Sequence, residues 1–548
     1  MAGAEGSRGG RHVLGVDVGT GSARAGVFDA AGRLLASAKT DITLHRAAGS
    51  IVEQSSAEIW QAVCRSVRAA VQLAGVDPAS IAGIGFDATC SLVVLGEGGV
   101  SLPVGPSEDP SRDIIVWMDH RAVPQAERIN ATGHEVLKYV GGVISPEMQT
   151  PKLLWLRENR RQTFDAARAF FDLADFLTWR ATGSLARSAC TVTCKWTYIA
   201  HEARWDESYF RAIGLGVLVD EDFARIGTEV AAPGAPLGQG LTRQAAAEFG
   251  LAPGTPVGAG LIDAHAGGIG TVGAMGAAGD PTTCLAYVFG TSSCTMTTTA
   301  APVFVSGVWG PYYSVMVPGA WLNEGGQSAA GAAIDHLLTL HPAAAAAKAT
   351  AESEGGSLPV WLAGAAAEGA ATLSDVVKHA GGLHVVPEFL GNRAPFADPS
   401  ARAVISGLGM ATDVQSLIGL YVAGLCGIGY GLRQIIEAQA DSGAPTDRIM
   451  ISGGAGQLDL VRQLLADSTG KSVVAAGSVE PVLLGSAMLG AVAGGVFENL
   501  PSAMGAMSSP GKTFHPASGE FEETHSVRYD AFIRLQKLAR DIRKTNGG

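Results

Sequence analysis

A segment near the N-terminus joins a carboxylate to a glycine-rich turn, a combination suited to binding a phosphate and its cation. In the stretch V-L-G-V-D-V-G-T-G-S-A-R, Asp17 ends an apolar strand and the turn follows directly. The backbone N–H groups of such a turn, with the hydroxyls of Thr20 and Ser22, can donate to an anion. A carboxylate at the strand end can hold hydrated Mg²⁺, which requires oxygen ligands. An ordinary hairpin turn is the competing interpretation of this segment alone.

The residues after this turn exclude two other nucleotide-binding motifs. A dinucleotide fingerprint needs a helix after the glycines, whereas the following A-R-A-G-V-F-D alternates as a strand does. The segment also lacks the G-K-[ST] of a Walker loop. A turn between two strands is therefore expected.

The same pattern returns in the second half of the chain. A strand over Thr283–Phe289 leads into G-T-S-S-C-T-M-T-T-T, which again predicts a turn between two strands. Two such loops, one opening each half, favour a phosphate chain clamped from both sides of a cleft. A third glycine pair, in I-S-G-G-A-G at Ile451–Gly456, would allow close approach of an adenine or ribose. A structural turn is the alternative for each loop.

Asp263 stands in G-L-I-D-A-H-A-G-G, between a predicted strand and a helix of small residues. A carboxylate within hydrogen-bond reach of a hydroxyl can orient that hydroxyl and accept its proton. Capping the helix is the alternative role for this side chain. His265, two residues later, is expected to be structural.

The elements that must position these groups follow from the hydrophobic pattern. A helix is predicted over Ser56–Ala74 and a strand over Ile81–Asp87. The apolar runs at Gly419–Leu432 and Val482–Phe497 are short for a bilayer span and are expected to be buried helices. The Ala-, Gly- and Ser-rich stretch Ala343–Gly369 is expected to be a mobile surface region or linker. The polar tail after Ser508 is expected to dock as a final helix.

The composition limits the classes of protein to which this chain can belong. A chain of 548 residues is too long for one core, and its 73 glycines indicate tight turns and close helix packing. With a net charge of −12 and no Lys/Arg stripe, neither a nucleic-acid nor a membrane partner is expected. Seven scattered cysteines and a start without an apolar signal core fit a cytoplasmic protein. Cys190 and Cys194 lie four apart, but no second Cys/His pair at zinc spacing follows, so a metal site there is not favoured.

Together, the three loops and Asp263 resemble the FGGY carbohydrate kinases, and the resemblance runs from about Val13 to Gly495. It implies an α/β fold of two duplicated actin-like ATPase (ribonuclease H-like) domains flanking a catalytic cleft. The implied domains are 12–272, with the first phosphate loop and the catalytic Asp, and 283–548, with the second loop and the adenosine motif. Residues 1–11 are expected to be disordered, and the boundary is placed near Gly270–Pro281.

The resemblance also implies ATP and Mg²⁺ as cofactors and assigns most of the site residues. Asp263 would be the catalytic base, and Asp17 and Asp263 would contact the metal. The expected ATP contacts are Gly19, Thr20, Gly21, Ser22, Arg24, Gly290, Thr291, Ser292, Gly453, Gly454, Ala455 and Gln457. The expected sugar contacts are Ala88, Thr89, Asp119, Lys195, Asp263 and Glu324.

Several of the sugar contacts have a plainer interpretation. Ala88 and Thr89 could simply end a strand, and Lys195 could be a surface lysine with a buried stem. Glu324 could favour a helix start. Asp119, with the His and Arg that follow it, could bind sugar or brace the cleft by ion pairing.

The substrate prediction rests on finer strings. G-F-D-A-T-C-S, W-M-D-H-R-A and C-K-W-T-Y look most like the ribulokinase-type members, closest to the D-ribulokinase branch. D-ribulose is therefore expected, with L-ribulose and ribitol left open because a few hydrogen bonds decide sugar specificity. Two rival classes are an actin- or chaperone-like ATPase and a sugar-sensing pseudo-kinase. A homodimer is possible.

Overall fold

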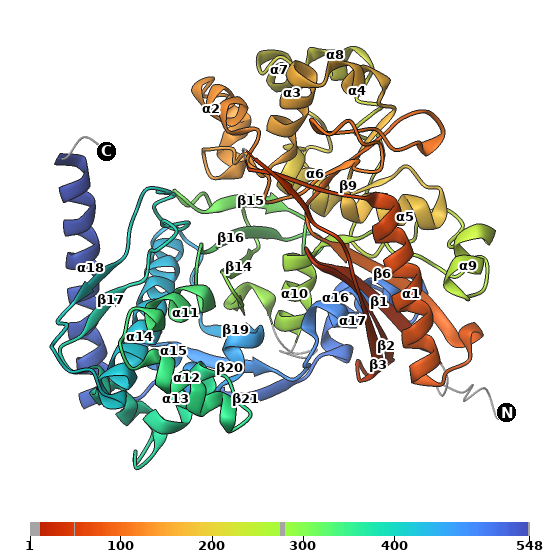
Figure 1. Cartoon of the computed structure of the whole chain (residues 1–548). Helices are drawn as coiled ribbons and strands as arrows, with labels where there is room; N and C mark the ends of the chain where they lie inside the picture. Colours follow the sequence, from red (N-terminus) through yellow and green to blue (C-terminus); the bar gives the residue numbers. More distant parts are fainter. Residues whose placement is uncertain (1–10, 49, 274–279, 546–548) are drawn as a thin grey trace.

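The computed structural model describes residues 11–48, 50–273 and 280–545, which form two lobes (Figure 1). The first lobe is built on a five-stranded sheet, and the second on a seven-stranded one. The first sheet has the order β12 (Leu261–Ile262), β6 (Ile81–Ala88), β1 (His12–Val18), β2 (Ser22–Asp29) and β3 (Leu34–Asp41). The second has the order β15 (Trp309–Tyr313), β16 (Trp321–Gln327), β14 (Ser293–Thr299), β13 (Cys284–Phe289), β19 (Arg448–Ser452), β20 (Ser472–Ala476) and β21 (Pro510–Phe514).

The two sheets share one arrangement around their first hairpins. β1 pairs antiparallel with β2 and parallel with β6, and β13 pairs antiparallel with β14 and parallel with β19. Each hairpin continues into a further antiparallel strand, β3 in one sheet and β16 in the other. The strand–turn–strand prediction for both glycine loops is confirmed, and so is the duplicated α/β fold.

A second set of strands and short helices extends the first lobe. It contains a sheet of order β4 (His45–Ala47), β5 (Ile51–Gln54), β8 (Ile114–Ile115), β7 (Leu92–Leu95) and β9 (Ala169–Asp172), and the small pair β10 (Arg187–Ser188) and β11 (Val230–Ala231). The helices of this lobe are α1 (Ser56–Ala74), α2 (Val123–Ala131), α3 (Gln149–Asn159), α4 (Arg161–Ala166), α5 (Leu173–Thr182), α6 (Ala189–Trp196), α7 (Glu207–Ala212), α8 (Gly216–Asp220), α9 (Arg243–Phe249) and α10 (Asp263–Val272).

The second half of the chain adds further helices. They are α11 (Gly331–Thr339), α12 (Ala344–Ser353), α13 (Leu358–Ala367), α14 (Val414–Asp441), α15 (Asp459–Thr469), α16 (Pro481–Ala493), α17 (Leu500–Met507) and α18 (Glu520–Thr545), beside the strand pair β17 (His384–Val386) and β18 (Val404–Ser406). The final helix α18 confirms the expectation for the tail. α14 is long and apolar enough to cross a membrane, but 78% of its most apolar window is buried in the protein, as expected of a core helix.

One expectation about this lobe was wrong. Residues 343–369 are largely helical, as α12 and α13, and not a linker. The alanines that suggested low complexity are also the strongest helix formers, and Leu362 and Ala366 bury against the lobe's core. Of the N-terminal segment expected to be disordered, residues 1–11, only Arg11 lies within the described residues.

Helix α16 links the two lobes because it comes from the end of the chain but packs on the first sheet. It lies against β1, β6 and α10 (Figure 1). A Cβ on Gly85 of β6 would lie 1.9 Å from the carbonyl oxygen of Ser486, so only glycine allows this approach. The division into 12–272 and 283–548 stays a prediction, since α16 belongs to one range by sequence and to the other lobe by packing.

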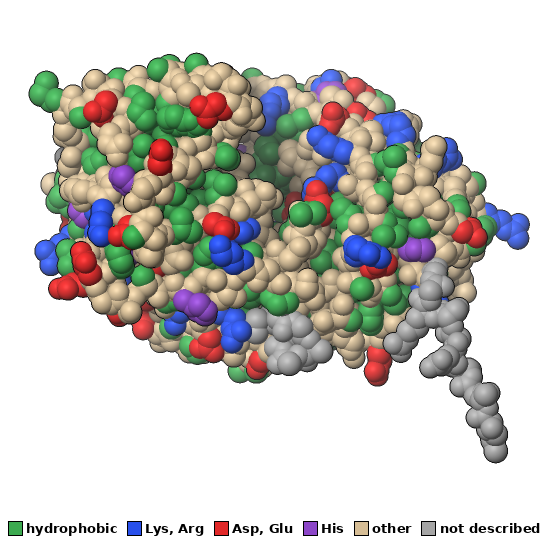
Figure 2. Space-filling model, turned by 90° about the horizontal axis from the view of Figure 1, so that it is seen from below, with side chains coloured by type: hydrophobic (Ala, Val, Ile, Leu, Met, Phe, Trp, Pro, Cys, Tyr) green, Lys and Arg blue, Asp and Glu red, His purple; other side chains and the backbone are tan. Residues whose placement is uncertain are grey.

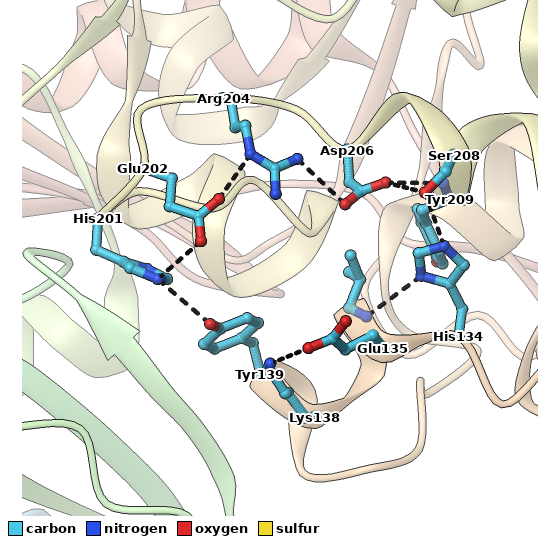
Figure 3. A network of polar contacts seen from close by, with 11 residues as sticks. His134, Glu135, Lys138, Tyr139, His201, Glu202, Arg204, Asp206, Ser208 and Tyr209 are labelled. Carbon is cyan, nitrogen blue, oxygen red and sulfur yellow. Dashed lines mark hydrogen bonds and ion pairs between the residues drawn. The ribbon is translucent and has the colours of Figure 1, made fainter.

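A chain of polar contacts fixes the segment that follows α6 (Figure 3). His201 contacts the hydroxyl of Tyr139 at 3.3 Å, and Arg204 bridges Glu202 and Asp206. The ring of Tyr139 also lies 5.7 Å from that of Phe304 in the second lobe. The network therefore holds this part of the first lobe where the two lobes meet.

Candidate active site

The first glycine turn joins β1 to β2 in the first lobe, and Figure 2 shows a hollow between the two lobes. The turn is closed by the N–H of Gly19, which donates to the carbonyl of Ser22 at 3.0 Å. The Thr20 hydroxyl accepts from the indole of Trp117 at 3.0 Å, which ties the turn to the W-M-D-H-R segment. A Cβ on Gly21 would meet nothing within 4 Å, so this residue leaves open space at the turn.

Arg24 ties this turn to the start of α16. Its Nε donates to Asp17 at 2.7 Å, and its Nη1 donates to Glu480 at 2.8 Å. The pKa of Arg24 is raised: burial opposes the charge, but Asp17 and Glu480 outweigh it. The guanidinium therefore neutralises the charge of Asp17.

Sequence reasoning missed a second carboxylate beside Asp17. Asp87 of β6 stands directly opposite Asp17 in the parallel register of β1 and β6. It is fully buried, accepts a hydrogen bond from Ser486 of α16, and leaves its Oδ1 without a partner. Burial and the facing Asp17 raise the pKa of Asp87 well above its usual value. The signal available was a second strand ending in an acid, G-F-D-A.

Asp263 begins α10, at the end of the short strand β12, which pairs with β6. Its Oδ1 accepts from the N–H of Ala264 at 2.7 Å, and the side chain is only partly buried. Burial and the nearby Asp17 raise the pKa of Asp263 to about 6. A carboxylate with this pKa is ionised at neutral pH yet basic enough to take a proton.

The second turn meets the first helix of its own lobe. The carbonyls of Gly290 and Thr291 accept from the N–H groups of Gly331 and Ala330 at 3.0 and 2.9 Å. The N–H of Gly290 donates to Ser292 at 2.9 Å, which keeps the turn tight. The predicted residues Gly290, Thr291 and Ser292 thus form a rigid turn at the start of α11.

The third loop and Arg24 line one cavity of about 300 Å³. The described walls include Gly453, Gly454 and Gln457 of the loop, and Ser478–Val482 before and within α16. Gly453 has φ of 93°, and a Cβ there would lie 2.4 Å from the carbonyl of Phe289. Two predicted ATP-binding segments, one per lobe, therefore come together. Ala455, in the same 3₁₀ turn Gly454–Gln457 (η7), is not among the cavity walls.

The predicted sugar contacts Lys195 and Glu324 lie in one buried group. Lys195 of α6 is 6% exposed, and its Nζ sits 5.1 Å from the ring centre of Trp309. Burial by itself raises the pKa of Glu324, but Lys195 and then His265 reverse this and lower it to about 2. Burial would lower the pKa of Lys195, but Cys90 and Glu324 raise it well above its usual value. Both groups therefore stay charged and can contact hydroxyls.

Ala88 and Thr89 lie where β6 reaches the first turn. Ala88 is fully buried opposite Val18, and the N–H of Thr89 donates to the Val18 carbonyl at 3.0 Å. The Thr89 hydroxyl contacts that of Ser91 at 3.1 Å. These two residues hold the strand end beside the acids.

Asp119 is bound differently from the other predicted sugar contacts. It is fully buried, accepts from the N–H of Val52 at 2.6 Å, and receives Nε and Nη2 of Arg121 at 2.9 and 2.7 Å. Both of its oxygens are thus engaged within the protein. This geometry fits the bracing role that the sequence left as an alternative.

Two further side chains near the sugar group, Arg393 and Glu147, were not among the predicted contacts. Arg393 lies 5.9 Å from the ring centre of Trp309, on the second lobe. Glu147 pairs with His120 at 3.5 Å, and Lys195 and Arg393 help to lower its pKa against the effect of burial. The sequence did not single out either side chain as a contact, and the fold brings both into the electrostatic neighbourhood of Lys195 and Glu324.

The acids near Asp17 fit a hydrated divalent cation. Asp17 and Asp87 face one another, one oxygen of Asp87 has no partner, and Asp263 is close enough to change the pKa of Asp87. Mg²⁺ takes few protein carboxylates and keeps several waters. Carboxylates at the ends of neighbouring strands match this preference.

A larger cavity than the one beside Arg24 lies elsewhere. A cavity of about 730 Å³ on the first lobe is lined by residues that include Trp60, Trp179 and three arginines. It contains none of the loops or acids described above. Volume alone therefore does not locate the chemistry.

Comparison with known proteins places this geometry among sugar kinases. The model of the FGGY family of carbohydrate kinases, N-terminal domain, matches residues 12–270, and that of the C-terminal domain matches residues 285–494. An FGGY carbohydrate kinase domain-containing protein of Homo sapiens is 45% identical over 540 residues, covering 96% of each chain. A D-ribulokinase of Saccharomyces cerevisiae is 37% identical over 575 residues, covering 98% of this chain and 78% of its own.

Solved structures agree on the fold. A xylulose kinase from Rhodospirillum rubrum superposes with a TM-score of 0.79 at 21% identity, covering 97% of this chain and 99% of its own. A Plasmodium falciparum glycerol kinase with ADP gives 0.75 at 16% identity, covering 96% and 98%.

Proposed function

Because the chain belongs to the FGGY family of carbohydrate kinases, we propose that it transfers the γ-phosphoryl group of ATP to a pentulose, with D-ribulose as the substrate. The observation that carries the proposal is the convergence of three groups at one cleft. These are the acids at the ends of β1 and β6, the nucleotide cavity, and the Lys195–Glu324 pair beside Trp309. The likeness to the yeast D-ribulokinase supports the choice of sugar.

Asp263 would act as the general base. With a pKa of about 6, it is ionised at neutral pH and can take the proton of a sugar hydroxyl. The hydroxyl oxygen then forms a bond to the γ-phosphorus while the bond from that phosphorus to the β–γ bridging oxygen breaks, and ADP leaves. The transition state is loose, so positioning of the two substrates contributes more than the base itself.

The other site residues would orient the sugar and neutralise the charge of the phosphates. Lys195 and Glu324 bear opposite charges and offer a donor and an acceptor to sugar hydroxyls. The backbone N–H groups of the turns and the Arg24 guanidinium would meet the phosphates. Asp17 and Asp87 would hold Mg²⁺, which supplies charge neutralisation on the phosphates.

Several expectations remain predictions under this proposal. Mg²⁺ as the cofactor follows from the acids, and a cytoplasmic location and a homodimer stay predictions as well. L-ribulose and ribitol remain the alternative substrates. A sugar-sensing pseudo-kinase is the alternative of a different class.

ADP release tests the proposal. Purified protein with Mg-ATP would be given D-ribulose, L-ribulose, D-xylulose, ribitol, glycerol or no sugar. We expect strong stimulation by D-ribulose and a loss of about 10²–10⁴-fold in Asp263→Asn, which keeps the shape of the side chain. Asp335→Asn, an exposed carboxylate on α11, is the matched control. Sugar-independent turnover, or full activity in Asp263→Asn, would contradict the proposal.

A further inference from the structure

Two thiols and an imidazole meet directly behind the sugar group. Cys190 and Cys194 lie one turn apart on α6, and His265 lies in the first turn of α10. Their ligand atoms all lie within 4.8 Å of one another, and each side chain is fully buried. In the part of the chain that the structure describes, this is the one such trio of metal-binding side chains.

The sequence pattern does not reveal this group because His265 is distant in sequence from the two cysteines. Positions four apart on a helix share a face, so α6 presents both sulfurs together. The third ligand comes from 71 residues beyond Cys194 and reaches the thiols only through the pairing of β12 with β6. A search for two short-spaced pairs could not find it.

The surroundings of the trio are those of a metal site. The Nδ1 of His265 points to the sulfur of Cys190 at 3.0 Å, while its Nε2 lies 3.4 Å from the Glu324 carboxylate. A histidine that turns one nitrogen to a metal usually donates the other to a carboxylate, which fixes the ring. The N–H of Ile262 also donates to the Cys190 sulfur at 3.5 Å, as backbone amides do for ligating thiolates.

We propose that Cys190, Cys194 and His265 form a binding site for a thiophilic divalent cation of the Zn²⁺ type, separate from the Mg²⁺ used with ATP. Thiolate and imidazole ligands select such a metal, whereas Mg²⁺ requires oxygen. Two thiolates and a neutral imidazole balance the charge of the cation, so the occupied site adds no net charge to the core. Three protein ligands leave a fourth coordination position open.

Occupancy of this site should slow the kinase. With Zn–S of about 2.3 Å and Zn–N of about 2.0–2.1 Å, tetrahedral ligands require an N-to-S separation of about 3.6 Å. The observed 3.0 Å must therefore lengthen, which moves His265 away from Cys190. His265 is two residues from Asp263 and contacts Glu324, so the base and a sugar contact would both shift. Displacements on this scale lower turnover by about tenfold.

Cobalt is the direct probe of the thiol ligands. Full-length reduced protein would be titrated with Co²⁺ in excess Mg²⁺, and the thiolate-to-cobalt charge-transfer absorption recorded. We expect saturation at one cobalt per chain, displacement by Zn²⁺, and loss of the band in Cys190→Ser and in Cys194→Ser. Cys426→Ser, a buried thiol of α14, should keep the band. Absence of the band in the unmodified protein, or its persistence in the two serine variants, would overturn the proposal.

Thermal stability and kinase activity provide two further readouts, and neither depends on the cobalt absorption band. Zn²⁺ should raise the unfolding temperature of the unmodified protein but not that of Cys190→Ser, since a ligand stabilises only the state that binds it. If a serine variant is unfolded before the titration, Cys194→Ala is tested in its place. Zn²⁺ should also lower ADP release about tenfold, with chelator reversal. A cobalt band without inhibition would overturn the coupling to the sugar site, and this outcome is distinct from a protein without kinase activity.

Discussion

The two hairpins β1–β2 and β13–β14 have the same backbone plan but different chemistry. Counting back from the turn glycines, Asp17 stands two residues before Gly19, and Val288 stands two residues before Gly290. Across the parallel neighbour, Asp17 faces Asp87, whereas Val288 faces Ser452. The first hairpin and its parallel neighbour therefore carry a pair of acids where the second hairpin and its neighbour carry an apolar residue and a hydroxyl.

This difference shows how a duplicated fold divides one task. Both turns can present backbone N–H groups to phosphates, so either lobe can hold an anion. Only the first hairpin has carboxylates at the strand ends beside its turn, so only this turn is placed to share a phosphate with a divalent cation. The second lobe contributes rigid surfaces, including the glycine loop at Gly453 and the ring of Trp309.

The sharpest test is to remove the acid that distinguishes the hairpins. Asp17→Asn should lower kcat by about 10²–10³-fold, because a fixed charge beside the transferring phosphoryl group is lost. The loss should be accompanied by a higher Mg²⁺ requirement. Steady-state kinetics over a range of Mg²⁺ concentration measures both effects.

Val288→Thr is the equivalent change in the second hairpin. It alters polarity at the corresponding position without adding or removing charge, and we expect a far smaller loss of kcat. Equal losses in the two variants would show that the hairpins share the metal-binding role, contrary to the comparison above.

The packing faces of the hairpins offer a second test. A Cβ on Gly15 would lie 2.1 Å from the carbonyl of Leu483 in α16. The corresponding position of the second hairpin already holds Ala286, which is fully buried. Gly15→Ala should therefore destabilise the protein by about 1–3 kcal/mol, because the backbone of α16 must move.

Ala286→Gly is the matched change, and it should cost about 0.5–1 kcal/mol through backbone entropy. Denaturant unfolding of both variants, followed by far-ultraviolet circular dichroism, ranks them. A Gly15→Ala variant that is more stable than Ala286→Gly would contradict the close approach of β1 to α16.

The pH dependence of activity should reflect the ionisation of Asp263, a residue of the first lobe. Asp263 must be ionised to accept a proton, and its pKa is raised to about 6. The value of kcat/KM should thus be level near pH 7 and above, and fall tenfold per pH unit below about 6. A profile from pH 5 to 8, with Asp263→Asn lacking the acid limb, tests this. A midpoint near the ordinary carboxylate value would mean that Asp263 is not held as described.

Local patterns predicted the hairpins well because each hairpin lies within one short stretch. The alternation after the first turn gave the second strand, and the helix predicted over Ser56–Ala74 has the same bounds in the structure. Glycines where backbones touch were also indicated by composition. The family resemblance added Lys195 and Glu324, which the structure brings together beside Trp309.

What could not be predicted depends on pairing between distant segments. The position of Asp87 opposite Asp17 depends on the register of β6 with β1, and no local sequence pattern predicts this register. Arg393 and Glu147 are distant in the sequence, and only the fold brings Arg393 close enough to help lower the pKa of Glu147. Asp119 lay in a suggestive string, yet its oxygens are engaged by Arg121 and Val52. Residue type alone does not distinguish a free carboxylate from an engaged one.

The position of α16 has a consequence for how the chain folds as it is synthesised. β1 and β6 emerge early from the ribosome, but the face that α16 covers finds its partner only after residues 481–493 are made. Roughly 400 residues separate the two events, which corresponds to about 20–80 s at 5–20 residues per second. Through that interval the nascent first lobe exposes an apolar, glycine-lined strand surface. A chaperone that recognises such surfaces, or a slow step in releasing the nascent chain, would therefore govern the yield of this enzyme more than the stability of its finished fold.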